Sequence, residues 1–387
     1  MLSRRLAKRG HAVETAADGA AALEMLAASP FDLVLLDVMM PGIDGFEVLR
    51  RVRETRSPMQ LPVIMATAKD QAQDIVQALE HGASDYVTKP LDFSVVMARV
   101  GTQLALKRSV DQIVALEASL KAQNVELERA NGKMKRDLRS AAKLQKALLP
   151  GASPASSRAA FAWMYVPCDE LAGDIFNVFA LDDRHVGMYL LDVSGHGVPA
   201  ALLSVTLSRV LAPVPGQSSL VMRSGPAGLE PTPPHEVIAE LNRRFPMEGT
   251  ISQYFTMIYG VLDTASGHFR YSCAGHVGPA VVRREGPSEI LETPALAVGW
   301  DPAAPYEDLR MILAPGDRVY IYSDGITETL NASRRQLGNA GILASLQGSR
   351  SGTLDQSLLD LRRCAEEWGR AASFDDDVSA VALEWRG

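Results

Sequence analysis

The first hundred residues alternate between apolar runs and segments with helical periodicity. Two nearly continuous apolar runs, at 31–37 and 61–68, are typical of parallel strands that are covered on both faces. Between them, residues 45–53 place apolar side chains at helical spacing. This alternation predicts a doubly wound α/β domain whose site forms at the carboxyl ends of the strands.

Residues 104–149 repeat an apolar side chain every seven positions. One heptad position is apolar throughout, being occupied by Leu106, Ile113, Leu120, Leu127, Met134, Ala141 and Leu148. The second heptad position that a coiled coil needs to be apolar is mixed. It holds Leu116, Ala130 and Leu144 but also Ser109, Gln123 and Asp137. The repeat favours a left-handed coiled coil that joins two chains as a homodimer. The polar positions leave open a single amphipathic helix folded against its own domain.

Another pattern begins after Pro150, where apolar runs adjoin aspartates in short turns. Such runs lead into Asp192 and Asp324, and a third begins just after Asp376. Asp174 lies in a glycine-containing turn of its own. Because strand ends of one sheet can converge, we expect these four carboxylates to lie together.

Converged carboxylates repel one another and also repel an anionic substrate, so this arrangement requires cations. Hard oxygen ligands select Mg²⁺ or Mn²⁺. Two such ions offset four carboxylates, and water bound between ions about 3.5–4 Å apart loses its proton far more readily than bulk water. The chemistry predicted is in-line attack on phosphorus. A single aspartate beside glycine is often only a turn residue, but four of them favour a metal centre.

The motifs around these aspartates occur in order between Leu144 and Leu383. They are L-Q-K-A-L-L-P, L-A-G-D-I-F-N, L-L-D-V-S-G-H-G-V-P-A-A-L, L-N-R-R-F, S-C-A-G-H, P-G-D-R-V-Y-I-Y-S-D-G-I-T-E and D-D-D-V-S-A-V. Together they resemble the bacterial PPM/PP2C-type phosphatases of the SpoIIE and RsbU kind. The resemblance implies an α+β domain over residues 150–387, with a PP2C-like β-sandwich flanked by helices. It also implies a metal-dependent protein serine/threonine phosphatase.

The resemblance assigns roles to individual residues. Asp192 would bridge two metal ions, Mn²⁺ or Mg²⁺, and Asp174 would bind one of them. Asp324 and Asp376 would bind the other ion, and the backbone carbonyl of Val193 would add a further oxygen. Asp192 and Asp174 are therefore the expected catalytic residues.

Two positions depart from the pattern of these phosphatases. Ala172 stands where a second glycine is usual, which costs little because alanine fits most turns that do not need positive φ. Asn177 stands where an aspartate is frequent, so we expect one negative charge fewer near the metals and weaker ion binding. His196 is predicted to be a loop residue near the site, and His276 a turn or packing residue.

Residues 212–234 are rich in proline, glycine and serine. They predict a flexible surface loop before a helix that starts near Pro234. The loop is either a lid over the site or a passive insertion.

The strand ends of the first segment carry Asp37, Thr67 and Lys89. With Tyr86 they resemble the site of a response-regulator receiver domain. The resemblance implies that Asp37 accepts a phosphoryl group from an upstream sensor histidine kinase. Thr67 would bind the new phosphate, Lys89 would pair with it, and Tyr86 would change position. Pro90, which follows Lys89, predicts a cis peptide bond.

Receivers of this kind start with a central strand ending in an acidic pair that holds Mg²⁺, whereas residues 1–11 predict a helix. We therefore expect the receiver, residues 1–103, to lack its first strand. It should bind Mg²⁺ only if the missing acidic pair is supplied. A start codon assigned too far downstream, or a trimmed chain, would explain the difference.

The overall composition fits a multidomain globular enzyme. The chain has 387 residues, of which 47% are hydrophobic and 22% charged. It has no apolar run near the roughly 20 residues of a membrane span and no signal peptide, so the cytoplasm is the expected location. Three cysteines without paired or metal-ligand spacing agree with a reducing compartment. A net charge of −7 gives no electrostatic reason to bind nucleic acid.

These features predict a two-component response regulator with a phosphatase output. By resemblance, the substrate would be a phosphorylated STAS-type anti-sigma-factor antagonist. An alternative is a pseudophosphatase scaffold that binds the antagonist without hydrolysis, which only Asn177 supports. A diguanylate cyclase, suggested by A-G-D-I-F at 172–176, lacks its own signature and leaves three aspartate motifs unexplained.

Overall fold

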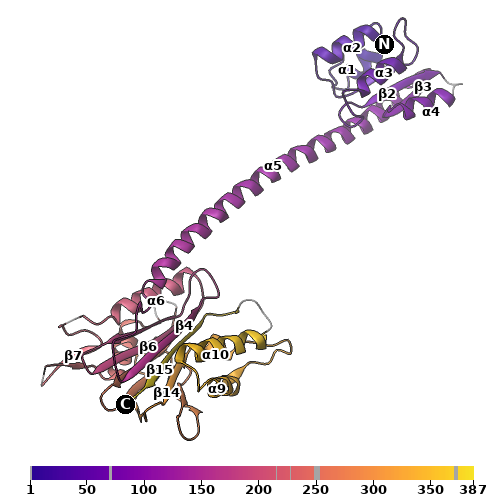
Figure 1. The fold of residues 1–387 in the computed structure, drawn as a ribbon. Coiled ribbons are helices and arrows are strands. Elements are labelled where there is room, and N and C mark those ends of the chain that lie inside the picture. The colour runs from indigo at the N-terminus through magenta and orange to yellow at the C-terminus, as the bar shows by residue number, and fades with distance from the viewer. Residues whose placement is uncertain (1, 69–71, 215, 227, 248–252, 370–373) are drawn as a thin grey trace. The chain divides into compact units, whose positions relative to one another are not determined.

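The computed structural model describes residues 2–68, 72–214, 216–226, 228–247, 253–369 and 374–387. The chain forms two compact units, Met1–Ala130 and Asn131–Gly387. Helix α5 (Phe93–Lys146) runs through the boundary between them (Figure 1). Among the described residues, no helix combines the length and the apolar character needed to cross a membrane.

The first unit is built on a parallel sheet, which within the described residues has three strands in the order β1-β2-β3. The strands are β1 (Val34–Asp37), β2 (Val63–Ala68) and β3 (Asp85–Lys89). The helices before α5 are α1 (Leu2–Ala7), α2 (Gly19–Ala28), α3 (Gly45–Arg53) and α4 (Ala72–Glu80). Along β2, Val63 and Met65 pack into one apolar cluster and Ile64 and Ala66 into another. Both faces of the sheet are therefore covered, as the prediction of a doubly wound α/β domain requires.

Helices α2 and α3 begin at aspartates that cap them. The carboxylates of Asp18 and Asp44 each accept a hydrogen bond from the backbone N–H three residues later, at 2.9 and 2.8 Å. The residue after the second cap must be glycine, because a Cβ on Gly45 would lie 2.2 Å from the carbonyl oxygen of Asp37. The start of α3 is thus packed directly against the end of β1.

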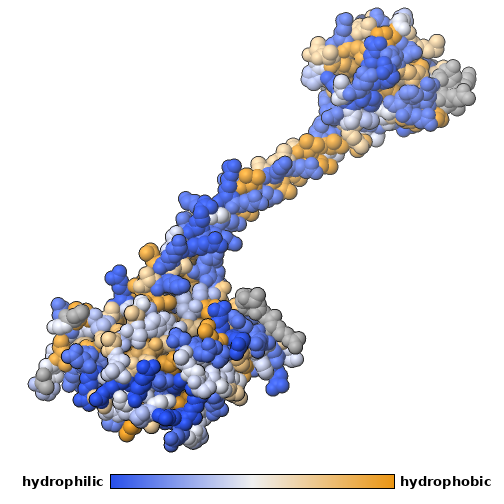
Figure 2. All heavy atoms as spheres, viewed as in Figure 1, coloured by the Kyte–Doolittle hydropathy of each residue, from blue (hydrophilic) through white to orange (hydrophobic). Residues whose placement is uncertain are grey.

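Helix α5 changes character along its length. Its first turns bury Val96 and Val100 against the parallel sheet. Beyond them the large apolar residues of the heptad repeat are exposed, namely Leu106, Ile113, Leu116, Leu120, Leu127 and Met134. Figure 2 shows apolar side chains on the surface of this helix. Among the described residues, no apolar face covers this part of the repeat.

The end of the repeat behaves differently from the prediction. Helix α5 stops at Lys146, and Leu148, the last heptad residue, lies beyond it. Leu148 and Leu149 pack against the core of the second unit. Leu148 therefore belongs to the core of that unit rather than to a coiled-coil seam.

The second unit is a sandwich of two five-stranded antiparallel sheets, with strand orders β13-β10-β9-β6-β5 and β12-β11-β14-β15-β4. The first sheet contains β5 (Ile175–Ala180), β6 (His185–Val193), β9 (Phe255–Asp263), β10 (His268–Ala274) and β13 (Leu309–Ile312). The second contains β4 (Ala159–Val166), β11 (Ala280–Val282), β12 (Glu289–Ile290), β14 (Arg318–Tyr322) and β15 (Val378–Trp385). The predicted PP2C-like sandwich is confirmed.

Three apolar clusters give the second unit its layers. The central one joins the inner faces of the two sheets, with Leu190 from β6 and Val381 from β15 among its members. The outer clusters hold α6 (Val198–Val210) and α7 (Pro234–Arg244) on the first sheet. They hold α9 (Gly338–Gly348) and α10 (Leu354–Gly369) on the second. The order is therefore helices, sheet, sheet, helices.

The described parts of the segment 212–234 are more ordered than predicted. It contains a hairpin of β7 (Met222–Gly225) and β8 (Gly228–Pro231). Val221 and Met222 are buried in the cluster that includes α6 and α7. The prediction of a flexible surface loop is wrong for this part, because its apolar residues anchor it in the core.

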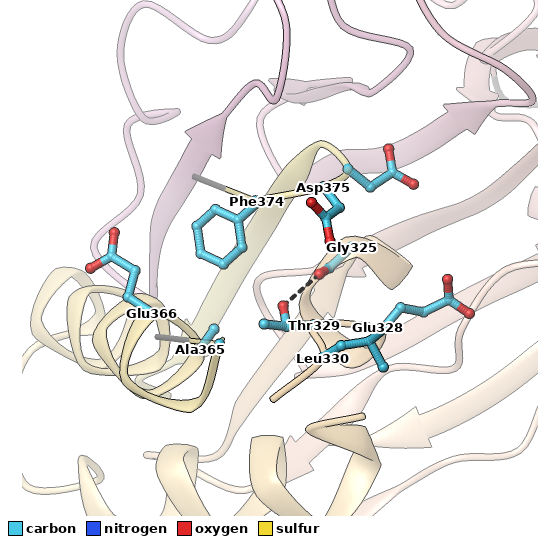
Figure 3. A pocket seen from close by; sticks show the side chains of 10 residues that line it. Gly325, Glu328, Thr329, Leu330, Ala365, Glu366, Phe374 and Asp375 are labelled. Carbon is cyan, nitrogen blue, oxygen red and sulfur yellow. Dashed lines mark hydrogen bonds between the residues drawn. The ribbon is translucent and has the colours of Figure 1, made fainter. Parts of the chain in front are cut away.

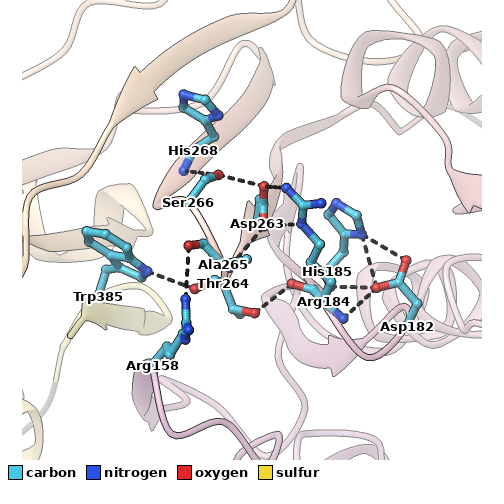
Figure 4. Close-up of polar contacts among 10 residues, drawn as sticks. All are labelled: Arg158, Asp182, Arg184, His185, Asp263, Thr264, Ala265, Ser266, His268 and Trp385. Carbon is cyan, nitrogen blue, oxygen red and sulfur yellow. Dashed lines mark hydrogen bonds and ion pairs between the residues drawn. The ribbon is translucent and has the colours of Figure 1, made fainter. Parts of the chain in front are cut away.

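The two sheets are also joined by polar contacts where β6 begins and β9 ends (Figure 4). The guanidinium of Arg184 forms a bidentate pair with Asp263, which lowers the pKa of that carboxyl group. In the next turn, the indole N–H of Trp385 on β15 donates to the carbonyl of Thr264 at 3.1 Å. This network lies at the opposite end of β6 from Asp192.

Candidate functional site

Strand pairing places the four predicted aspartates at the ends of strands that adjoin. In the first sheet Ile175 pairs with Leu191, so Asp174 and Asp192, one residue further on, lie at the same end. In the second sheet Tyr322 pairs with Ala380. Asp324 follows β14 and Asp376 precedes β15, and these two also lie at one end. The sandwich then brings the two pairs together.

The electrostatics of these groups show that their charges influence one another. Burial raises the pKa of Asp192 to about 7, and the nearby carboxylates of Asp324 and Asp376 add to the effect. Burial and then Asp192 raise the pKa of Asp174 well above its ordinary value. The pKa values of Asp324 and Asp376 are also raised, again first by burial. Each charge therefore disfavours ionisation of the others.

Asp174 is the most constrained member of this group. Its side chain is 1% exposed, and neither carboxylate oxygen has a hydrogen-bond partner in the described part of the chain. Buried polar atoms are nearly always paired. A buried, unpaired carboxylate that faces another carboxylate has the chemistry expected of a cation ligand. The residues present therefore fit a divalent metal centre.

The turn before Asp174 packs closely against the end of β6. A Cβ on Gly173 would lie 2.9 Å from the carbonyl oxygen of Val193 and 3.5 Å from Oδ1 of Asp192. Glycine at position 173 thus lets the loop approach both predicted oxygen ligands. Ala172 is fully buried beside it.

Sequence reasoning missed the role of Asp377. This buried carboxylate accepts hydrogen bonds from the backbone N–H groups of Cys168 at 2.9 Å and Gly173 at 2.7 Å. It therefore ties the loop of the first sheet to the start of β15. The signal was the run of three aspartates at 375–377, but the letters alone do not distinguish one member from the next.

A thiol also lies in this region. The sulfur of Cys168 and single carboxylate oxygens of Asp376 and Asp377 lie within 4.8 Å of one another. Burial raises the pKa of the Cys168 thiol to about 12, with Asp377 adding to the effect. Cys168 is therefore a neutral thiol at physiological pH, not a thiolate.

The histidines take the places predicted for them. His196 is exposed in the turn between β6 and α6. His276 is buried, with Nδ1 2.8 Å from the hydroxyl of Thr256, which pairs with Asp192 across the sheet. Burial lowers the pKa of His276 to about 4, so its ring is neutral. It is a packing residue next to the site.

Asn177 lies away from the carboxylates. In β5 it pairs with Tyr189 of β6, and its Oδ1 accepts a hydrogen bond from the N–H of Val178 at 2.8 Å. Its neighbours Phe176 and Val178 face the central cluster, whereas Tyr189 belongs to the helix-covered cluster. Because successive side chains alternate in a strand, Asn177 faces the helices. The expected loss of charge near the metals does not apply.

A pocket of about 260 Å³ opens next to Asp376 (Figure 3). Its lining includes Phe374 and the carboxylates of Glu328, Glu366 and Asp375. Pockets that bind whole small molecules are usually larger, about 300–1,000 Å³. This pocket is below that range.

The predicted receiver residues lie at one edge of the parallel sheet. Asp37 ends β1, and its Oδ2 is 2.5 Å from the Nζ atom of Lys89 at the end of β3. Thr67, near the end of β2, is buried, and Tyr86 is half-buried on β3. The peptide bond between Lys89 and Pro90 is cis, as predicted.

Comparisons with known proteins agree with both units. The family model for stage II sporulation protein E (SpoIIE) matches residues 182–386, and the model for the response regulator receiver domain matches residues 1–101. Response regulator PleD of Caulobacter vibrioides is 42% identical over 119 residues, which are 31% of this chain and 26% of PleD. Transcriptional regulatory protein AfsQ1 of Streptomyces coelicolor is 50% identical over 95 residues, or 24% of this chain and 41% of AfsQ1. The chain thus spans less than half the length of these relatives.

One solved structure resembles the second unit in fold. The SiaA-PP2C domain of Pseudomonas aeruginosa aligns with a TM-score of 0.56 and 16% identity, over 66% of this chain and 98% of that domain. At this identity the likeness concerns the fold alone. Since the SpoIIE model covers more than half of the residues, the chain belongs to the SpoIIE family and carries a response regulator receiver domain at residues 1–101.

Proposed function

We propose that this chain is a response regulator whose output is a metal-dependent protein phosphatase for phosphorylated serine or threonine. The observation that carries the proposal is the buried Asp174 carboxylate, which has no hydrogen-bond partner within bonding distance among the described residues and whose pKa is raised by burial and by Asp192. The proposed domains are the receiver at 1–103, the helical linker at 104–149 and the phosphatase at 150–387.

The proposed metal ligands are the four aspartates and one carbonyl. Asp192 would contact both ions, Asp174 one of them, and Asp324 and Asp376 the other, with the Val193 carbonyl completing the set. Two Mn²⁺ or Mg²⁺ ions would supply an acidified water and neutralise the phosphate. Without cations, the clustered carboxylates repel a phosphate dianion. The chain's own contribution is to hold these oxygens together against their mutual repulsion.

The geometry also bears on the substrate. The pocket beside Asp376 suits a side chain carried by a protein. The proposed substrate is a phosphorylated anti-sigma-factor antagonist of the STAS type, as the SpoIIE and RsbU resemblance implies. The scaffold alternative depended on Asn177, whose place on the helix-covered face gives it no support.

The direct test uses the full chain and a phosphorylated STAS-type antagonist. Release of phosphate should require Mn²⁺ or Mg²⁺ and stop in EDTA. A phosphoserine peptide should be a poorer substrate if protein contacts contribute. Full turnover in EDTA would exclude the metal mechanism, and binding without turnover at any metal concentration would favour the scaffold.

For the receiver we propose that Asp37 accepts a phosphoryl group from a sensor histidine kinase. Lys89 already contacts the acceptor, and Thr67 and Tyr86 occupy neighbouring strands. The end of α5 is the segment through which the state of the receiver would reach the Asp174 loop.

The exposed apolar residues of α5 support a parallel coiled-coil dimer. Leu120, which is 55% exposed, should lie at the seam, whereas Ala118 should face away from it. Leu120→Glu should shift the full chain from dimer to monomer at micromolar concentration, and Ala118→Glu should not. Sedimentation velocity measures both. A parent chain that is already monomeric would contradict the coiled coil.

A further inference from the structure

Trp300 is a large apolar side chain that the second unit leaves in contact with solvent. Its side chain is 55% exposed, although tryptophan is on average one of the more buried residue types. It lies in the turn after Val298, which pairs with Phe255 at the start of β9. Met247, which is 39% exposed, joins the same turn, since its N–H donates to the carbonyl of Gly299 at 2.9 Å. Two exposed apolar side chains are therefore held next to each other.

The turn that carries Trp300 is fixed by a buried residue of α7. The side chain of Asn242 is 1% exposed, and its amide oxygen accepts a hydrogen bond from the N–H of Gly299 at 2.8 Å. Its amide nitrogen donates to the carbonyl of Asp301 at 2.7 Å. The residues on both sides of Trp300 are thus bound to α7. An aromatic ring on a fixed backbone loses little conformational freedom when it binds a partner.

Trp300 also borders the end of β6 that carries the proposed metal ligands. Its ring meets the ring of Tyr254 edge to face, with the centroids 5.3 Å apart. The N–H of Tyr254 donates to the hydroxyl of Ser194 at 3.1 Å, and its carbonyl accepts from the N–H of Ser194 at 2.9 Å. Ser194 directly follows Val193, whose carbonyl is a proposed metal ligand. The aromatic pair therefore adjoins the metal end of the first sheet.

We propose that Met247, Tyr254 and Trp300 form a docking patch for the phosphorylated protein substrate, an inference that rests on the proposed function. A phosphate at the metal centre brings the neighbouring residues of its own protein near the patch, since each residue of an extended chain spans about 3.3 Å. Aromatic residues and methionine are enriched in protein interfaces, and tryptophan is frequent among the residues that contribute most to affinity. The patch binds an apolar side chain close to the phosphorylated residue and so favours a protein over a small phosphate ester.

The test compares two substrates of the full chain at saturating Mn²⁺. One is a phosphorylated STAS-type antagonist, and the other is p-nitrophenyl phosphate, which has no polypeptide to dock. The measured quantity is the ratio of kcat/KM for the antagonist to kcat/KM for p-nitrophenyl phosphate. Trp300→Ala should lower this ratio at least about tenfold, through a higher KM for the antagonist. Trp300→Phe, which keeps an aromatic ring, should lower it less than Trp300→Ala does.

Ile312→Ala is the matched control for losing an exposed apolar side chain. Ile312 is 66% exposed and pairs with His268, which lies in the polar network of Figure 4 at the opposite end of the sheet from the metal ligands. This variant should leave the ratio unchanged. Met247→Ser, at the edge of the docking patch, should lower the ratio about threefold. It carries the test if Trp300→Ala does not fold.

The proposal is overturned if the ratio is unchanged in Trp300→Ala and Met247→Ser, including the case in which activity on both substrates falls equally. It is also overturned if Trp300→Ala converts a dimer to a monomer in sedimentation velocity, because the patch would then join two copies of the chain. If the parent chain hydrolyses neither substrate, the proposed function fails instead. Calorimetric binding of the antagonist then decides the role of the patch, and Trp300→Ala should weaken it at least about tenfold.

Discussion

In the receiver unit the Asp37 carboxylate lies 2.5 Å from the ammonium of Lys89. In the phosphatase unit, the Asp174 carboxylate has neither an ion-pair partner nor a hydrogen-bond partner among the described residues. The charges that raise the pKa values of Asp174 and Asp192 are all carboxylates in the described residues. The receiver thus carries its own counter-charge at a half-exposed edge. The phosphatase unit buries negative charge, and its proposed metal mechanism requires cations from solution.

The largest effect expected from this difference is on Asp192, which faces the other carboxylates. Asp192→Asn removes the oxygen charge proposed to contact both ions, so kcat/KM should fall at least about 10³-fold. Asp183→Asn is the matched control, because Asp183 is exposed near the other end of β6. Phosphate release from the phosphorylated antagonist measures both. Near-parental activity of Asp192→Asn would show that the phosphatase unit does not need this carboxylate to bind its proposed cations.

Stability of the metal-free chain should depend on pH in a direction set by the raised pKa values. The pKa of Asp192 is about 7 in the folded chain against an ordinary value of 3.8, so the folded state holds more protons between these values. The contribution of Asp192 to stability is therefore fully present below about pH 4 and is lost as pH rises through about 7. The shift corresponds to about 4 kcal/mol for Asp192 taken alone.

Thermal unfolding in EDTA at pH 5 and pH 8 measures this dependence. The phosphatase unit should melt lower at pH 8, and Mn²⁺ should abolish the difference. Asp192→Asn should weaken the dependence, since one of the coupled groups no longer ionises. A metal-free chain that is more stable at pH 8 than at pH 5 would mean that the carboxylates have cationic partners after all.

Asp377 differs from Asp174, because this buried carboxylate accepts hydrogen bonds from backbone N–H groups. Asp377→Ala leaves the N–H groups of Cys168 and Gly173 unpaired, at about 1–3 kcal/mol each. We expect a loss of about 2–4 kcal/mol in urea unfolding. Asp375→Ala, at an exposed neighbour, should change stability by less than about 0.5 kcal/mol. Equal losses in the two variants would show that Asp377 is no more a tether than Asp375.

These residues also show how much of the fold and of the site could be predicted from the sequence. Periodicity predicted the layers of the receiver unit, because apolar runs reflect which faces are covered, whereas the layers of the second unit were predicted from the resemblance of its motifs. The aspartates could be located because each adjoins a strand end. Choosing between the roles of Asp376 and Asp377 requires knowing which backbone groups face them, and these come from Cys168 and Gly173, over 200 residues earlier.

Strand register and the end of a helix explain the remaining differences between the predictions and the structure. Asn177 was expected near the metals, but it lies on the helix-covered face, and this becomes known only once Ile175 is paired with Leu191. Leu148 continues the heptad in sequence, yet the helix has ended at Lys146 and the side chain joins another core. Such outcomes depend on tertiary contacts that local pattern does not contain.

The smallest expected effect is at Lys89. The side chains of Lys89 and Asp37 are 41% and 38% exposed, so water already solvates both charges. Removing the cation by Lys89→Ala should therefore change the free energy of unfolding of the receiver by less than about 1 kcal/mol. Urea unfolding of the full chain, followed by a probe in the receiver, measures it, and Lys8→Ala at an exposed position of the same unit is the control. A loss as large as that of Asp377→Ala would show that the receiver carboxylate also depends on its partner for folding. The solvated Asp37–Lys89 pair would then matter as much for folding as the buried carboxylate of Asp377.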